Sequence, residues 1–163
     1  MKSKLLLSNK AILPLLVAIF FLQTGCDKEE EVPTSTVLHS GPIQMNGDSQ
    51  RPNRAATTGS GLATVSYDRP KKTISYTINW VLGSGASTTL MHFHGSPTGS
   101  PEVASPVVIG ISGFSASNSG FLTGITRELT ESEEADFLAG KWYLNIHSSA
   151  YGSGELRGQV IFP

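Results

Sequence analysis

The chain has 163 residues, of which 39% are hydrophobic and 15% charged, which suits one packed domain and leaves too little chain for two. Its formal net charge of -1, from 12 basic and 13 acidic residues, provides no positive surplus to neutralise a phosphate backbone, so no nucleic acid partner is expected. The 17 glycines and 9 prolines favour a turn-rich β protein over a helical bundle.

The first 25 residues have the layout of an export signal. Three lysines and no acidic residue precede a nearly continuous apolar run over residues 11–22, which is shorter than the roughly 20 apolar residues of a membrane-spanning helix. The run ends in the sequence LQTGC at residues 22–26, which resembles the cleavage site of a bacterial lipoprotein. We expect cleavage before Cys26, the single cysteine, and attachment to the membrane through a lipid on its thiol.

The residues directly after Cys26 are charged. Lys28, Glu29 and Glu30 resemble the signal that sends certain Gram-negative lipoproteins to the outer face of the outer membrane, and the alternative is a solvated tether. We therefore expect a surface-exposed lipoprotein of the bacterial outer membrane. The division of the chain is a signal peptide at 1–25, the lipidated cysteine with an acidic flexible tether at 26–36, and one domain at 37–163.

Apolar and polar residues alternate through most of the domain. Ala63, Val65 and Tyr67 begin the pattern, and a turn at residues 68–71 leads into a second alternating segment, as in an antiparallel hairpin. Strands are predicted over residues 62–67, 73–82, 88–94, 107–111, 121–127, 142–147 and 156–162. Trp80 and Trp142 lie on the apolar faces of their strands, so we expect them in the core and not as platforms for a sugar.

One short helix interrupts the strands. Thr130 and Glu133 have the spacing of a capping box, and Gly140 follows the apolar residues at a position where a helix can end. The acidic residues of this segment fit the charge preference of a helix N-terminus. The predicted fold is all-β, an antiparallel Greek-key-like β-sandwich with one short helix.

Several motifs together resemble the CHRD domain, a family named for the repeated domain of chordin. They are MHFHG at 91–95, WYLNIH at 142–147 and GELRGQV at 154–160, with residues 41–45 similar to its opening strand. The resemblance implies an extracytoplasmic β-sandwich that acts as a binding or interaction module. The partner it would bind, a protein or a glycan, is not identified.

The H-x-H strand and the glycine-rich loop after it are also similar to the copper-site strand of Cu,Zn superoxide dismutase, another β-sandwich. The chain has only 4 histidines, too few for the paired copper and zinc sites of that family, and it has no cysteine pair. Dismutase activity is therefore not expected.

His92 and His94 are two residues apart in a predicted strand, so their side chains project from the same face with Cα atoms about 7 Å apart. His147 in another strand is a candidate third ligand, and imidazole suits copper or zinc. His39 and Glu155 are weaker candidates. The alternative is that the histidines form hydrogen bonds with a loop and bind no metal.

Asn145, Glu155 and Arg157 form a predicted polar cluster. Glu155 and Arg157 share one face of a strand, where they could pair with each other, form hydrogen bonds with a loop, or recognise a ligand; a structural charge pair is favoured over ligand recognition. No G-x-S-x-G motif is present and Cys26 is assigned to the lipid, so no catalytic nucleophile is identified and no enzymatic activity is expected. The rival hypotheses are a metal-dependent redox enzyme that uses the histidines and a purely structural envelope component.

Overall fold

The computed structural model describes residues 35–95, 98, 100 and 102–163. The chain divides into two units, and all described residues belong to the second, Thr34–Pro163. The predicted signal peptide, Cys26 and the charged segment with Lys28, Glu29 and Glu30 lie outside the described residues.

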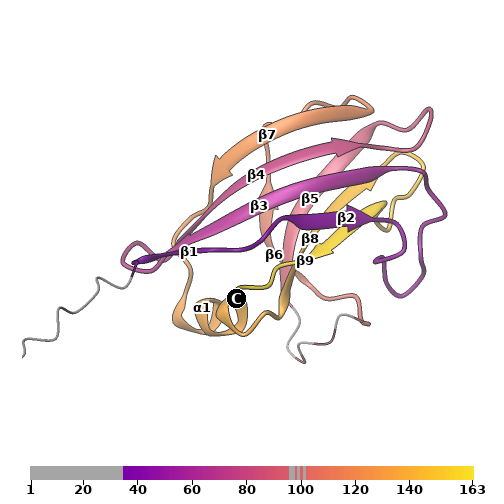
Figure 1. Cartoon of the computed structure of the whole chain (residues 1–163). Helices are drawn as coiled ribbons and strands as arrows, with labels where there is room; N and C mark the ends of the chain where they lie inside the picture. Colours follow the sequence, from indigo (N-terminus) through magenta and orange to yellow (C-terminus); the bar gives the residue numbers. More distant parts are fainter. Residues whose placement is uncertain (1–34, 96–97, 99, 101) are drawn as a thin grey trace, which may run out of the picture. The chain divides into compact units, whose positions relative to one another are not determined.

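Nine strands and one helix make up the described unit (Figure 1). Every pair of neighbouring strands runs antiparallel. The elements are β1 (Val37–His39), β2 (Ile43–Asn46), β3 (Ser60–Asp68), β4 (Thr73–Val81), β5 (Thr88–Gly95), β6 (Val107–Ile111), β7 (Ser119–Ile125), α1 (Glu131–Leu138), β8 (Trp142–Ser148) and β9 (Leu156–Gln159).

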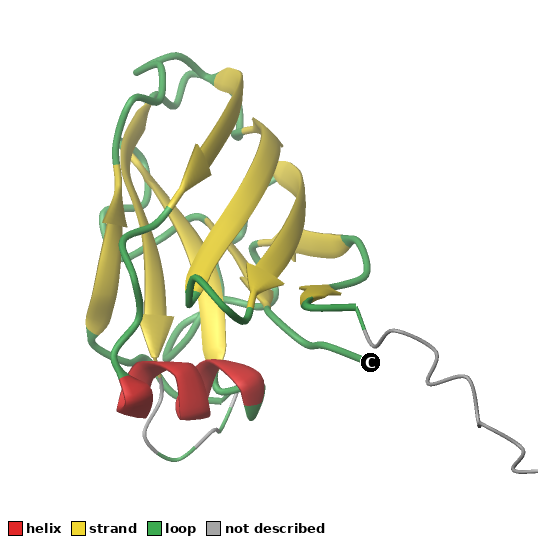
Figure 2. Cartoon of the chain, turned by 90° about the vertical axis from the view of Figure 1, so that its left-hand side faces the viewer, coloured by secondary structure: helices red, strands yellow, loops and turns green. Residues whose placement is uncertain are grey.

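The strands form one continuous sheet in the order β6-β5-β8-β9-β2-β3-β4-β7, with β1 paired to β3 outside this sequence. The sheet curls strongly into a half-barrel (Figure 2). The natural twist of β-strands makes such curling possible. The predicted all-β antiparallel fold with one short helix is confirmed. The expected sandwich takes the form of a single curled sheet because β2 joins the two halves, pairing with β3 on one side and β9 on the other.

The hydrophobic core lies inside the curl. On β3, Ala63, Val65 and Tyr67 are buried while the residues between them face outward, as the period of two requires. Trp80 and Trp142 are 2% and 1% exposed, which confirms the prediction that both belong to the core.

Glycine makes room for one of these tryptophans. Gly120 of β7 stands opposite Trp80 of β4, and a Cβ atom at Gly120 would lie 2.4 Å from the indole ring. The indole Nε1 donates a hydrogen bond of 2.8 Å to Thr88 Oγ1. The edge strand β7 therefore packs directly against the indole ring of Trp80, and any side chain larger than that of glycine at position 120 would displace the ring.

Helix α1 closes one end of the curled sheet (Figure 2). Its buried residue Phe137 contacts the rings of Tyr67 and Trp142, with centroid distances of 5.6 and 5.2 Å. The predicted capping box is confirmed, because Thr130 Oγ1 accepts from the Glu133 amide and Glu133 Oε2 accepts from the Thr130 amide. In the described part of the chain, no helix has both the length and the apolar character needed to cross a membrane.

Strands β8 and β9, and β5 from Met91 onward, are covered on both sides, unlike the other strands. In β8 even the polar residues Tyr143 and Asn145 are buried, where the sequence predicted simple alternation. Residues 47–57 and 102–106 lie over the outer side of these strands, where Gln50 bonds Asn145 and Arg157 bonds the Val103 carbonyl. The outer side therefore carries a buried polar layer, and the candidate site lies in it.

The ion pair beside the capping box predicts how stability depends on pH. Both carboxylate oxygens of Glu133 accept from Arg127, each at 2.7 Å, and this bidentate hydrogen bond lowers the pKa of Glu133 from 4.5 to about 2. Because the folded-state pKa is depressed, the stabilisation is complete above pH 4.5 and is lost as the pH falls toward 2.

We therefore expect Glu133→Gln, which keeps an N3 residue able to cap, to lower the free energy of unfolding by about 1 kcal/mol at pH 7, a value reduced for the exposure of Arg127. The difference should shrink between pH 4.5 and 2 in urea unfolding experiments, with Glu131→Gln as the control. An equal difference at pH 7 and pH 2 would contradict the assignment.

Candidate metal centre

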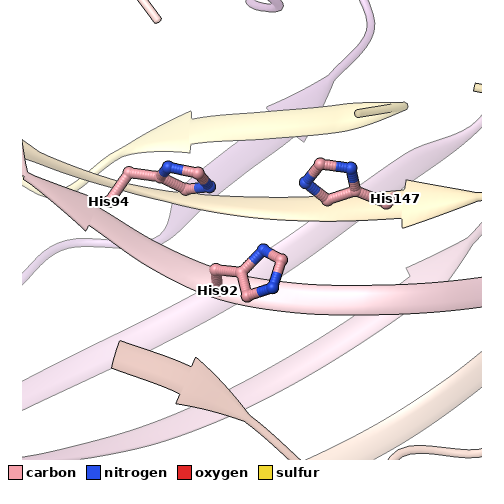
Figure 3. A group of neighbouring side chains, drawn as sticks. All are labelled: His92, His94 and His147. Carbon is pink, nitrogen blue, oxygen red and sulfur yellow. The ribbon is translucent and has the colours of Figure 1, made fainter. Parts of the chain in front are cut away.

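Three of the four histidines converge on the outer side of β5 and β8 (Figure 3). His92 and His94 alternate with buried Phe93 along β5, and the pairing of β5 with β8 places His147 diagonally across from His92. One ring nitrogen from each histidine lies within 4.8 Å of the others. The structure thus brings together the three residues that the sequence nominated, including His147, whose position depends on the strand pairing.

The hydrogen bonds of two histidines determine which nitrogen is available. His94 Nδ1 lies 2.7 Å from the Ser105 carbonyl oxygen, and His147 Nδ1 lies 2.9 Å from the Gly152 carbonyl oxygen. A carbonyl only accepts, so each neutral ring carries its proton on Nδ1 and has a lone pair on Nε2. Histidine ligands of metals are commonly oriented in this way by a carbonyl.

The remaining nitrogens of the cluster are buried and have no partner. His92 Nδ1, His94 Nε2 and His147 Nε2 form no hydrogen bond with any described residue. A buried polar atom without a partner is costly and requires an explanation. These three atoms belong to a histidine group whose geometry could hold a metal ion.

The environment keeps the imidazoles of His92 and His94 uncharged. Burial lowers the pKa of His94 below its ordinary value of 6.5, and the neighbouring His92, His147 and Arg157 lower it further, against the opposing bond to Ser105. Burial, followed by the proximity of His147, also lowers the pKa of His92. These two rings are therefore neutral at pH 7, which is the form that binds a metal.

A stack of side chains holds His94 in place. The His94 ring lies parallel to the Tyr143 ring, with centroids 4.7 Å apart and an interplanar angle of 3°. The guanidinium carbon of Arg157 lies 3.5 Å from the centre of the Tyr143 ring, a cation–π contact. Tyr143 Oη in turn accepts from the Ser105 amide at 3.0 Å, so the residue whose carbonyl binds His94 is itself fixed by the stack.

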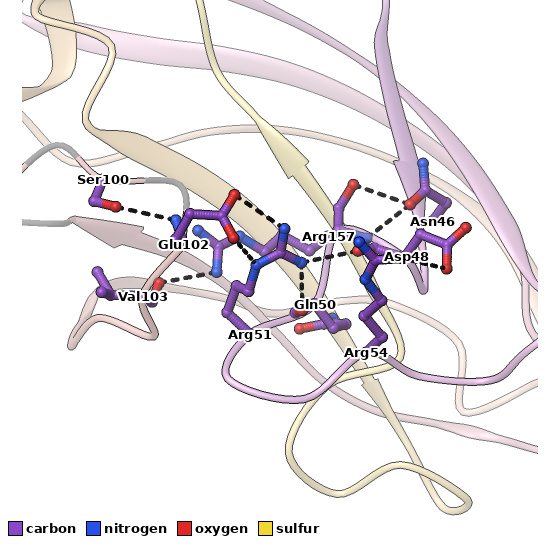
Figure 4. Close-up of polar contacts among 10 residues, drawn as sticks. Asn46, Asp48, Gln50, Arg51, Arg54, Ser100, Glu102, Val103 and Arg157 are labelled. Carbon is purple, nitrogen blue, oxygen red and sulfur yellow. Dashed lines mark hydrogen bonds and ion pairs between the residues drawn. The ribbon is translucent and has the colours of Figure 1, made fainter.

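Two arginines form hydrogen bonds with the segment of residues 102–105, which contains Ser105 (Figure 4). Arg51 donates to both carboxylate oxygens of Glu102 at 2.7 and 3.1 Å, and Arg157 donates to the Val103 carbonyl at 3.0 Å. The sequence pattern did not indicate Arg51, Glu102 or Tyr143 as supports of the site. Ser105 binds His94 through its backbone carbonyl, which every residue type has, so the residue types of this segment do not indicate the role.

The predicted polar residues lie beside the histidines but have separate partners. Asn145 Oδ1 accepts from Gln50 Nε2 at 2.7 Å. Glu155 Oε1 accepts from Thr57 Oγ1 and from the Gly83 amide, both at 2.6 Å, so Glu155 does not form the proposed ion pair with Arg157. His39 on β1 forms a hydrogen bond of 2.8 Å with Ser66 on β3. Neither His39 nor Glu155 belongs to the described histidine cluster.

The stack predicts that Arg157 is a structural residue of the site. Arg157 is 2% exposed, so Arg157→Ala removes a buried cation–π contact and the bond to Val103 and leaves a cavity. We expect the free energy of unfolding to fall by about 3 kcal/mol. Chemical denaturation provides the measurement, and the exposed Arg54→Ala serves as control with a change below about 0.5 kcal/mol. Equal effects of the two substitutions would show that the stack contributes nothing.

Comparison with known proteins identifies the family of this domain. No curated protein and no solved structure gives a significant match, so the likeness to the Cu,Zn superoxide dismutase sandwich stays a prediction. The model of the CHRD domain matches residues 42–160, a range that contains His92, His94 and His147 and omits His39. Because this match covers most of the chain, the protein belongs to the CHRD domain family.

Proposed function

We propose that the domain is a metal-binding module that holds one copper or zinc ion through His92, His94 and His147. The observation that carries this proposal is the convergence of three buried ring nitrogens without hydrogen-bond partners. Imidazole is a ligand for both metals, and three histidines with a fourth open position form a workable site for either. The carbonyls of Ser105 and Gly152 supply the outer contacts that orient two of the ligands.

The proposal is for binding and not for catalysis. Within the described residues the cluster consists of histidines only, so no carboxylate stands among them to act as a general base. A bound ion would supply a positive charge and an open coordination position, at which an external donor group could bind. The rival role, a metal-dependent redox enzyme, requires turnover by the loaded protein, whereas a purely structural role requires that no metal binds.

The proposal predicts the metal content of the purified chain. The full-length protein, produced without a histidine tag, should contain or take up about one copper or zinc ion per chain in elemental analysis. His94→Ala should weaken binding by at least about 100-fold, because it removes one of three ligands. The ion should raise the melting temperature of the wild type and not of the variant.

The fourth histidine offers a matched control. His39 is exposed and bonds Ser66, so His39→Ala should keep the metal. A wild type that takes up neither ion, or a His94→Ala variant that binds as tightly as the wild type, would overturn the proposal. If the wild type binds the ion, activity assays of the loaded protein would separate a binding role from a redox role.

We further propose that the protein is anchored to the bacterial outer membrane, at the cell surface, by a lipid on Cys26. Support comes from the order of residues 1–30, with lysines, an apolar run, LQTGC and an acidic cluster in succession. Such an anchor would present the metal site outside the cell. At the cell surface the interaction module would bind its partner, a protein or a glycan.

The anchor predicts fatty-acid labelling at one residue. Cells grown with an alkyne fatty acid should label the wild-type protein and not Cys26→Ser, because the chain has one thiol. A variant with alanine at Lys28, Glu29 and Glu30 should still be labelled, since these residues follow the modified cysteine. Labelling of Cys26→Ser, or none in the wild type, would refute lipidation.

A further inference from the structure

The outer face of β3, β4 and β7 lies away from the metal centre, on the other half of the sheet (Figure 1). Outward positions on these strands carry hydroxyl, amide and apolar side chains, except at the end of β3, where the outward Asp68 forms an ion pair with Lys71 at 2.7 Å. This neutral face consists of Ser60, Leu62, Thr64, Ser66, Ser75, Thr77, Asn79, Val81, Ser119, Phe121, Thr123 and Ile125.

One row of side chains crosses this neutral face at right angles to the strands. Gln44 on β2 pairs with Leu62, Leu62 pairs with Asn79, and Asn79 pairs with Phe121. Directly paired residues project from the same side of a sheet. Amides therefore alternate with apolar groups over three strand spacings, a length of about 14 Å.

The surface is hollowed on both sides of this row. A depression of about 520 Å³ is lined in part by Gln44, Asn79 and Val81. A second depression of about 300 Å³ includes the threonine row of Thr64, Thr77 and Thr123. Phe121 is 63% exposed, so a large aromatic ring on this face is left in contact with solvent.

The polar groups of the row are available for a ligand. The side-chain amides of Gln44 and Asn79 form no hydrogen bond among the described residues, as the polar contacts of the chain show. Each amide offers two donors and one acceptor oxygen. A dry contact with a second apolar surface would bury these groups unpaired at considerable cost, whereas a ligand rich in hydroxyl groups would satisfy them.

We propose that this neutral face binds an uncharged polysaccharide laid along the row from Gln44 to Phe121. The apolar C–H face of a sugar ring would pack on Phe121, and sugar hydroxyls would pair with the amides of Asn79 and Gln44. The absence of charge favours a neutral chain, because an acidic polymer would find no cation on the face to compensate its own charge. The shallow depressions accommodate the substituents of the sugar rings on either side.

Affinity electrophoresis tests the proposal with the full-length protein. Native gels containing hydroxyethyl cellulose, xylan, laminarin or mannan should include at least one that retards the wild type, while a polygalacturonate gel should not. Phe121→Ala should weaken retardation about fivefold and Phe121→Trp should preserve it. Val107→Ala, at a residue 50% exposed on the opposite edge strand β6, is the matched control and should bind as the wild type does.

Three outcomes would overturn the assignment. One is the absence of retardation by all four neutral polysaccharides, and another is equal retardation of Phe121→Ala and the wild type. The third is a dimer in sedimentation that Phe121→Ala dissociates, which would assign the face to a second copy of the chain. Thermal melting checks that Phe121→Ala remains folded, as expected for an exposed side chain.

Discussion

The antiparallel pairing of β5 with β8 is the constraint on which the rest of the domain depends. Its register sets Phe93 against Leu144 and Met91 against Ile146 on the inner side, where all four are at most 1% exposed. A slip of one residue would turn this apolar set outward. The same register places the three histidines on the outer side, so the burial of apolar groups inside positions the candidate metal ligands outside.

The outer side of these strands is buried without being apolar. Arg157, Asn145 and Glu155 are at most 4% exposed, and each has at least one polar partner that offsets part of its loss of water, although Glu155 Oε2 is buried without a partner among the described residues. This layer makes the histidine environment rigid, because Ser105 is held by Tyr143, which in turn lies under Arg157. The unpartnered imidazole nitrogens are thus set within a network whose other members are largely paired.

The two halves of the sheet present different chemistry to the outside. The half with β5, β8 and β9 is covered by polar segments, whereas the half with β3, β4 and β7 is open and carries a charge only at its end, at Asp68. Strand β2 links them, since Gln44 belongs to the open face and Asn46 pairs with Arg157. The candidate metal centre and the proposed ligand-binding face therefore share one fold without sharing residues.

The period-two pattern by itself determined the central strands, the inward side of each and the core tryptophans, because alternation is a local property of a strand. Thr130 and Glu133 likewise determined the start of the helix. The sequence pattern did not reveal β1, the joining of the two halves into one curled sheet, or the segment over β8, since these depend on pairing between distant residues. For the site, spacing nominated His92 and His94, but only strand pairing brought His147 within 4.8 Å. Only the tertiary structure showed that Glu155 and Arg157 have separate partners and that backbone carbonyls orient the ligands, because a backbone carbonyl leaves no mark in the sequence.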